Sequence, residues 1–131
     1  MAEVHILLVE DEEEWIEEII EVLAQEGYEG VDVVTSVAEA LALLRTIGPR
    51  HDLVITGWGI GANPFAGTEL IEKIREDERF KKLPIILHTP ADMQRDFRDV
   101  LYRLEGEWRA IYARKEKGLK PLIEAVKTRL G

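Results

Sequence analysis

Four residues of types that can bind cations and phosphoryl groups stand at the ends of separate apolar runs. Glu10 and Asp11 come after the first run, Thr89 closes the fourth and Lys115 lies just beyond the fifth. Carboxylates are the ligands that hard cations such as Mg²⁺ prefer, and a hydroxyl and an ammonium can bind phosphoryl oxygens. Because such sites form where the carboxyl ends of parallel strands meet, this chemistry depends on the elements that bring the four positions together.

The pattern of apolar residues predicts those elements. Short runs rich in Val and Ile predict strands over residues 4–9, 31–35, 53–56, 84–89 and 110–113. Apolar residues at helical spacing fill the stretches between and after them. Five strands that alternate with five helices predict a doubly wound α/β fold, in which helices cover both faces of a parallel sheet. We expect one domain over residues 1–131, because no repeat or linker interrupts the pattern.

One helical stripe lies between the fourth and fifth predicted strands. Its members, at the spacing of one helix face, are Met93, Phe97, Val100, Leu101 and Leu104. We therefore expect a single helix there, with these five side chains facing inward. The charged residues between them are then expected on its outer side.

The chain is acidic, with a formal net charge of −9, and the charge is uneven along it. Residues 1–48 hold 13 acidic residues and one basic residue, whereas residues 91–131 hold 7 acidic and 10 basic residues. Sequence-independent binding to nucleic acid needs a broad basic face, which this composition does not favour. No apolar run approaches the length of a membrane helix, and residues 1–5 do not resemble a signal peptide. We therefore expect a soluble, cytoplasmic protein that binds neither nucleic acid nor a membrane.

Two further features of the composition narrow the possibilities. The absence of cysteine excludes disulfides and cysteine-based metal or redox sites. One asparagine and two glutamines, against 33% charged residues, resemble the composition of thermophilic proteins.

Five short motifs together resemble one known family. They are residues 6–12 (ILLVEDE), 52–56 (DLVIT), 67–70 (GTEL), 83–89 (LPIILHT) and 112–115 (YARK). In this order and spacing they make the chain similar to the receiver domain of two-component response regulators over essentially its whole length. The resemblance implies a flavodoxin-like fold, with a five-stranded parallel sheet in the order 2-1-3-4-5.

The resemblance also shows where the chain departs from the family. Thr89, Tyr112 and Lys115 match the family's switch positions, whereas Gly57 stands where the family has its phospho-accepting aspartate. Glycine has no side chain that could accept a phosphoryl group or ligate a metal. The loop that follows, residues 57–66, is longer than in the family pattern. The phosphorylation site is therefore interpreted as degenerate on a preserved scaffold.

Glu10 and Asp11 remain as a residual acidic pocket and are the candidate metal ligands. With one carboxylate lost, we expect Mg²⁺ to bind weakly or not at all, and no other cofactor is expected. Gly57→Asp is expected to strengthen Mg²⁺ binding because it restores a carboxylate. Lys115 has no aspartyl phosphate to contact and is expected to form an ion pair with Glu10 or Asp11. Trp58, next to Gly57, either fills the pocket or lies exposed, and the sequence leaves both positions open.

The leading hypothesis for function is a pseudo-receiver. Such a protein is a signal-transduction module, not an enzyme, that binds other proteins and whose output does not depend on phosphorylation. One alternative is a receiver that is phosphorylated on an atypical acceptor. Another is a small-molecule or nucleotide binder, because Gly57–Ala62 matches the loose pattern G-x-G-x-x-A.

The family resemblance further implies where a partner docks. Receivers of this family usually signal through the face made by helix four, strand five and helix five, which here comes from residues 91–131. Arginine and tyrosine are enriched among the residues that dominate interfaces. The candidate contact residues on this face are Arg95, Arg98, Tyr102, Arg103 and Arg114. We expect an acidic surface, on a partner or on a second copy of the chain, to bind there.

Overall fold

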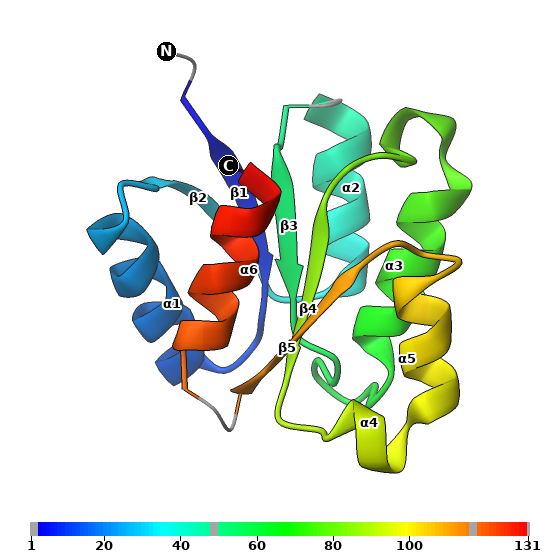
Figure 1. Ribbon diagram of the computed structural model, residues 1–131. Helices are drawn as coiled ribbons and strands as arrows, with labels where there is room; N and C mark the ends of the chain where they lie inside the picture. Colours follow the sequence, from blue (N-terminus) through cyan, green and yellow to red (C-terminus); the bar gives the residue numbers. More distant parts are fainter. Residues whose placement is uncertain (1–2, 48–49, 116–117, 131) are drawn as a thin grey trace.

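A five-stranded parallel sheet forms the centre of the molecule (Figure 1), and the computed structural model describes residues 3–47, 50–115 and 118–130 around it. The strand order is β2-β1-β3-β4-β5, which confirms the order expected from the sequence. The strands are β1 (His5–Val9), β2 (Gly30–Val34), β3 (Leu53–Thr56), β4 (Ile85–Thr89) and β5 (Ile111–Arg114).

Helices cover both faces of this sheet. They are α1 (Glu13–Gln25), α2 (Val37–Ile47), α3 (Ala66–Glu76), the 3₁₀ helix η1 (Glu78–Phe80), α4 (Met93–Asp96), α5 (Arg98–Glu105) and α6 (Lys120–Leu130). Figure 1 shows α1 and α6 together on one side of the sheet and α2, α3 and α5 on the other. Within the described ranges, no helix combines the length and the apolar character needed to cross a bilayer.

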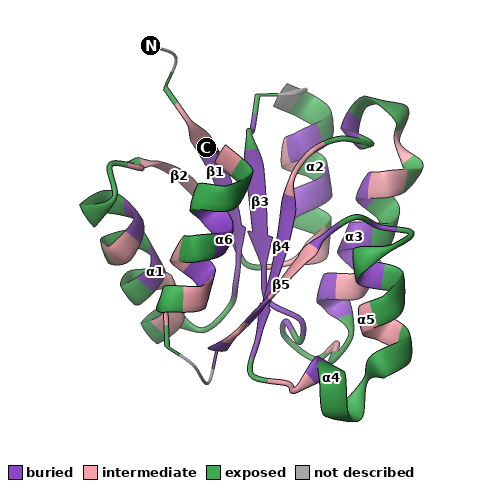
Figure 2. Ribbon diagram, in the orientation of Figure 1, coloured by how far each residue is buried: buried purple, intermediate pink, exposed green. Residues whose placement is uncertain are grey.

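Two apolar clusters separated by the sheet form the core. Figure 2 shows the largely buried central strands β1, β3 and β4 between helices whose outer faces are mostly exposed. Leu7 and Val9 of β1 point into the cluster shared with α2 and α3, whereas Ile6 and Leu8 point into the cluster shared with α1 and α6. All four side chains are fully buried. A central parallel strand is covered on both faces, which is why its sequence is apolar without alternation.

Local signals in the sequence set several helix ends. The backbone N–H of Glu39 donates to Ser36 Oγ (3.1 Å) and so caps the start of α2. Gly27, beyond the end of α1, has a φ of +92°, a conformation that glycine adopts readily. Its N–H donates to the Ala24 carbonyl (2.9 Å), which helps to close the last turn.

The expectation of one helix between β4 and β5 is wrong. The chain forms α4 and α5, separated at Phe97, whose φ of −140° and ψ of 50° are not helical. The ring of Phe97 meets Trp58 edge-on, 4.7 Å away between centroids, and the side chain stays 37% exposed. Met93 and Leu104 are buried as expected, and Val100 and Leu101 are half-buried against the same apolar cluster. Phe97 does not follow this inward stripe and packs on Trp58 in the loop of residues 57–66.

Candidate functional site

The carboxyl ends of β1, β3, β4 and β5 bring together most of the residues singled out from the sequence. In the register of the sheet, Val9 pairs with Thr56, and Thr89 pairs with Arg114. The Gly57 N–H donates to the Val9 carbonyl (2.9 Å), so Glu10 and Gly57 continue side by side beyond the strands. This edge of the sheet faces α4, at the bottom of Figure 1.

A buried ion pair joins Glu10 to Lys115. The Lys115 ammonium donates to both carboxylate oxygens of Glu10, each at 3.3 Å. The Glu10 side chain is 2% exposed and the Lys115 side chain is 8% exposed. Burial raises the pKa of Glu10, and the neighbouring Lys115 charge opposes that rise. Of the two acidic partners expected for Lys115, the structure therefore selects Glu10.

Gly57 faces the carboxylate of this pair. A Cβ atom placed on Gly57 would lie 2.5 Å from Glu10 Oε2, which is too close for two nonbonded atoms. A Cβ atom on Gly67 would likewise collide with the carbonyl oxygen of Gly57, because the start of α3 runs against this turn. The space that a side chain at position 57 would need is thus already filled by Glu10.

Asp11 does not share the buried position of Glu10. It is exposed, and its Oδ2 accepts a hydrogen bond from the Gly61 N–H (2.7 Å). Gly61 has a φ of +62°, within a turn that Ile60 and Asn63 close by a short antiparallel bridge. Asp11 therefore holds the loop of residues 57–66 against the start of α1.

A resident divalent cation does not fit this set of side chains. Such a cation takes about six oxygen ligands, several of them usually carboxylates. Here Gly57 offers no side chain, both oxygens of Glu10 contact Lys115, and one oxygen of Asp11 contacts Gly61. Across the residues that the structure describes, no three His, Cys, Asp or Glu side chains are grouped to hold a metal ion.

The two hydroxyl groups at switch-like positions both hold the segment between β4 and α4. Thr89 is buried, and its Oγ1 accepts from the Ala91 N–H (3.3 Å). The Tyr112 hydroxyl donates to the Ala91 carbonyl and accepts from the Met93 N–H (3.4 Å). Tyr112 therefore connects β5 to this segment and does more than pack on the sheet edge.

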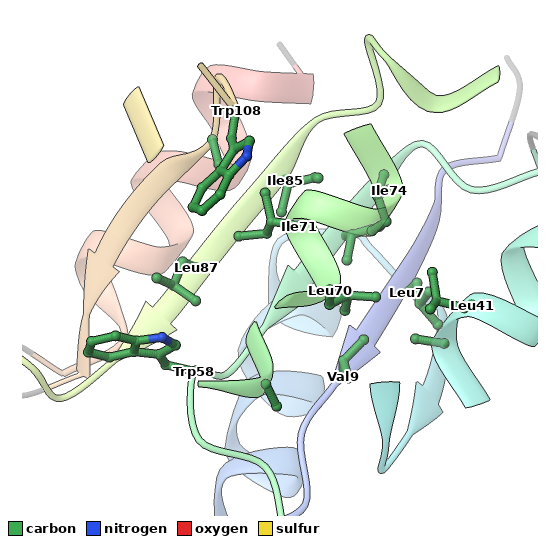
Figure 3. Close-up of a cluster of buried hydrophobic side chains, with 14 of the residues drawn as sticks. Leu7, Val9, Leu41, Trp58, Leu70, Ile71, Ile74, Ile85, Leu87 and Trp108 are labelled. Atoms are coloured by element: carbon green, nitrogen blue, oxygen red, sulfur yellow. The ribbon is translucent and has the colours of Figure 1, made fainter. Parts of the chain in front are cut away.

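Trp58 lies at one end of the larger apolar cluster, near Leu87 (Figure 3). It is buried, and its Nε1–H donates to Thr68 Oγ1 (3.2 Å). Phe65 and Phe97 meet its ring edge-on, with centroids 5.7 and 4.7 Å away. Of the two positions left open by the sequence, Trp58 is therefore buried, although Glu10 and not Trp58 takes the space facing Gly57.

Two residues of the site were not found from the sequence. The Trp15 ring lies 4.9 Å from Lys115 Nζ and 5.5 Å from the ring of His88, which it meets edge-on. His88 is buried, and neither ring nitrogen has a hydrogen-bond partner among the described residues. Burial, together with the Lys115 charge, lowers the pKa of His88 to about 3. Strand alternation places His88 on the face that α1 covers, but the spacing of the three histidines alone gave no reason to select it.

A cleft of about 670 Å³ opens beyond these strand ends, and we call it the strand-end cleft. Its walls come from the start of α1, the loop of residues 57–66, the segment of residues 89–97 and the end of β5. The lining residues are Glu12, Trp15, Trp58, Gly59, Pro64, Phe65, Thr89, Pro90, Ala91, Asp92, Arg95, Asp96, Phe97, Arg114 and Lys115.

The candidate partner face has mixed charge. Arg98 and Tyr102 are exposed on α5, and Tyr102 is 82% exposed. The other basic residues contact acidic neighbours in the pairs Arg95–Asp96 (3.0 Å), Arg103–Glu107 (3.1 Å) and Arg114–Asp92 (3.6 Å). The positive balance of residues 91–131 is therefore partly neutralised on this face.

Three lysines that follow β5 in the sequence, Lys117, Lys120 and Lys127, were further candidates for this face. Lys127 of α6 pairs with Glu26 at the end of α1 (2.9 Å), on the opposite side of the sheet from α5. Lys120 is exposed at the start of α6. Lys117 lies outside the described residues.

Comparisons with known proteins agree with this architecture. A sequence model of the response regulator receiver domain matches residues 6–105. Among solved structures, the non-phosphorylated receiver domain of HemR from Leptospira biflexa is 28% identical, with a TM-score of 0.79 over 98% of this chain and 95% of that chain. The phosphorylated cyanobacterial phytochrome response regulator RcpA is 26% identical, with a TM-score of 0.75 over 97% of this chain and 91% of that chain.

The chemotaxis protein CheY4 of Vibrio cholerae, 20% identical, shows the same fold, with a TM-score of 0.78 over 98% of this chain and 99% of that chain. None of the curated protein sequences compared with this chain matches it significantly. The sequence model spans well over half of the chain, and the solved structures match it almost end to end. The chain therefore belongs to the family of response regulator receiver domains.

Proposed function

We propose that this receiver domain is a pseudo-receiver, a protein-binding signalling module and not an enzyme, whose output does not depend on phosphorylation. The observation that carries the proposal is the contact between Gly57 and Glu10. The position that resembles the family's phospho-acceptor has no side chain, and the space in front of it holds the Glu10 carboxylate. Glu10 in turn contacts Lys115, the residue at the position that resembles the family's conserved lysine.

The remaining polar groups at the strand ends support the same proposal, because they already contact each other. Asp11 accepts from the loop of residues 57–66, and the Thr89 and Tyr112 hydroxyls hold the segment between β4 and α4. We propose that these contacts fix one conformation that needs no phosphoryl group. In this proposal Mg²⁺ binds weakly or not at all, because Glu10 and Asp11 would have to give up their present contacts.

Incubation with acetyl phosphate and Mg²⁺, followed by intact-mass measurement, tests the proposal. We expect no stoichiometric gain of a phosphoryl group. A receiver domain that has the acceptor aspartate, treated in parallel, verifies that the reagent is active. A gain of one phosphoryl group would overturn the proposal in favour of a receiver with an atypical acceptor, and fragmentation of the modified protein would locate that acceptor.

We further propose that a partner binds the face that carries Arg98, Tyr102 and Arg103. Tyr102 offers a large exposed ring, and Arg103 stacks on Trp108 with its guanidinium 4.3 Å from the ring centroid. A held arginine beside an exposed tyrosine is a combination common among dominant interface residues. Because Arg95, Arg103 and Arg114 have acidic neighbours, we expect charge to orient the partner more than to supply affinity.

Self-association provides the direct test of this face, since a second copy of the chain is one of its expected partners. Analytical ultracentrifugation of the wild type is compared with the variant Arg98→Glu/Arg103→Glu. Association at this face should weaken in the variant and also as salt rises. Arg79→Glu, on η1, is the matched control. A dimer that survives the double reversal unchanged, or a wild type that stays monomeric, would contradict a homodimer at this face.

A further inference from the structure

Aromatic residues are concentrated in the strand-end cleft. The chain has three tryptophans, three tyrosines and three phenylalanines, and four of these nine residues line this cleft. They are Trp15, Trp58, Phe65 and Phe97. The volume of about 670 Å³ lies within the range of small-molecule sites, which are usually lined by apolar and aromatic side chains with a few polar groups.

The aromatic walls come from opposite sides of the sheet. Trp15 packs on the cluster beneath α1 and α6, whereas Trp58 belongs to the cluster beneath α2 and α3. Phe65 and Phe97 both contact Trp58 and extend this wall, yet they remain 56% and 37% exposed. A molecule with flat apolar faces would cover these exposed rings and gain both apolar burial and ring contacts.

The charged groups of the cleft argue against an anionic ligand. Three acidic and three basic residues line it. Each base contacts an acid, in the pairs Arg95–Asp96 (3.0 Å), Arg114–Asp92 (3.6 Å) and Lys115–Glu10 (3.3 Å). A phosphate or carboxylate would have to displace one of these acids, whereas an uncharged ligand leaves all three pairs intact.

We infer that the strand-end cleft binds an uncharged, planar aromatic molecule of one or two rings, held between Trp15 and the wall formed by Trp58, Phe65 and Phe97. This ligand class differs from a nucleotide, whose phosphates would meet balanced charges here. The inference goes beyond the proposed function and does not depend on it, because a ligand of this kind needs neither a phosphoryl group nor a protein partner.

Titrations followed by NMR of the ¹⁵N-labelled full chain test the inference. The probes are indole, benzamide and adenosine, with indole-3-acetate and AMP as the anionic counterparts of the first and third. At least one neutral probe should shift the Nε1–H resonances of Trp15 and Trp58 in a saturable manner. Each neutral molecule should bind more tightly than its anionic counterpart, by about threefold or more.

Two exposed side chains allow a variant test that leaves the core intact. Phe65→Ala and Phe97→Ala should each weaken binding of the neutral probe by about three- to tenfold, because each removes one aromatic contact. Ile20→Ala, which shortens an equally exposed apolar side chain outside the cleft, is the matched control and should leave binding unchanged. The inference is overturned if no neutral probe gives a saturable shift up to about 5 mM, if the shifts lie away from the two tryptophans, or if AMP binds more tightly than adenosine.

Discussion

The Glu10 carboxylate lies 2.5 Å from the position that a Cβ atom on Gly57 would occupy. Gly57→Ala should therefore force Glu10 to move and lower the free energy of unfolding by about 1–3 kcal/mol, the usual cost of an overpacked site. Urea denaturation measures this loss. Gly59→Ala is the matched control, because a Cβ atom there would meet its nearest neighbour at 3.6 Å, an ordinary contact distance.

A double-mutant cycle with Glu10→Ala tests whether Glu10 causes the cost of Gly57→Ala. Once Glu10 is shortened, the Cβ atom of an alanine at position 57 has space, so Gly57→Ala should cost clearly less in that background. Equal costs in both backgrounds would show that the glycine is required for a reason other than Glu10.

The same contact changes the Mg²⁺ prediction made from the sequence. A carboxylate introduced by Gly57→Asp would meet that of Glu10, so the single variant should gain little affinity for Mg²⁺. Gly57→Asp combined with Glu10→Asp, which shortens the neighbouring side chain, should bind Mg²⁺ at least about fivefold more tightly than either single variant. Isothermal titration calorimetry on the four proteins tests this. Equal affinity of Gly57→Asp and the double variant would contradict it.

The Glu10–Lys115 pair should be costly to break from either side. Lys115→Met leaves a buried carboxylate without its counter-charge and should lower the free energy of unfolding by about 3 kcal/mol. Adding Glu10→Gln removes that charge and should recover part of the loss. Lys127→Met removes an exposed ion pair with Glu26 and should cost far less. Similar costs for the two lysines would show that burial does not strengthen the dependence on Lys115.

His88 should make the protein sensitive to mild acid. Its pKa falls from an ordinary value near 6.5 to about 3 on folding, so between these values the unfolded chain binds more protons than the folded one. The His88 contribution to stability is therefore complete above about pH 6.5 and is lost as the pH falls toward 3. Between pH 7 and pH 5 the free energy of unfolding should fall by about 2 kcal/mol through this residue.

Denaturation of the variant His88→Gln across this pH range isolates the effect. The variant should lose most of the pH dependence between pH 7 and pH 5, whatever its stability at pH 7. His5→Gln is the control, because the His5 side chain is only partly buried. An unchanged slope in His88→Gln would show that other groups cause the acid sensitivity.

Strands were predictable because their signal is local and their environment is uniform. Residues 53–56 were expected as a strand and form β3 with the same bounds. The central strands β1, β3 and β4 lie between two helical layers, so most of their positions favour an apolar residue. The break at Phe97 could not be predicted in this way, because the apolar residues keep their helical spacing across it. At the break, Phe97 contacts Trp58, a residue 39 positions earlier in the chain, and helical spacing carries no information about such a contact.

For the site, the sequence likewise predicted which positions come together but not all of their contacts. The carboxyl ends of neighbouring parallel strands converge, and this rule correctly predicted that Glu10, Gly57 and Lys115 lie close together. The sequence did not distinguish Glu10 from Asp11 as the partner of Lys115, because that choice depends on which of the two adjacent side chains is buried. Trp15 and His88 were missed for a related reason: their contact joins α1 to β4, and no spacing in the sequence signals it.

The ion pair between Glu10 and Lys115 spans 105 positions of the chain. Glu10 follows the first strand to be synthesised, and its counter-charge follows the last. A chain that has assembled β1 to β4 alone therefore holds an unpaired carboxylate at its sheet end, and the arrival of β5 neutralises it. Contacts this distant in sequence tend to form late in folding, so substitutions of Lys115 should act mainly by accelerating unfolding. The ion pair should therefore slow the opening of the completed sheet more than it speeds its assembly.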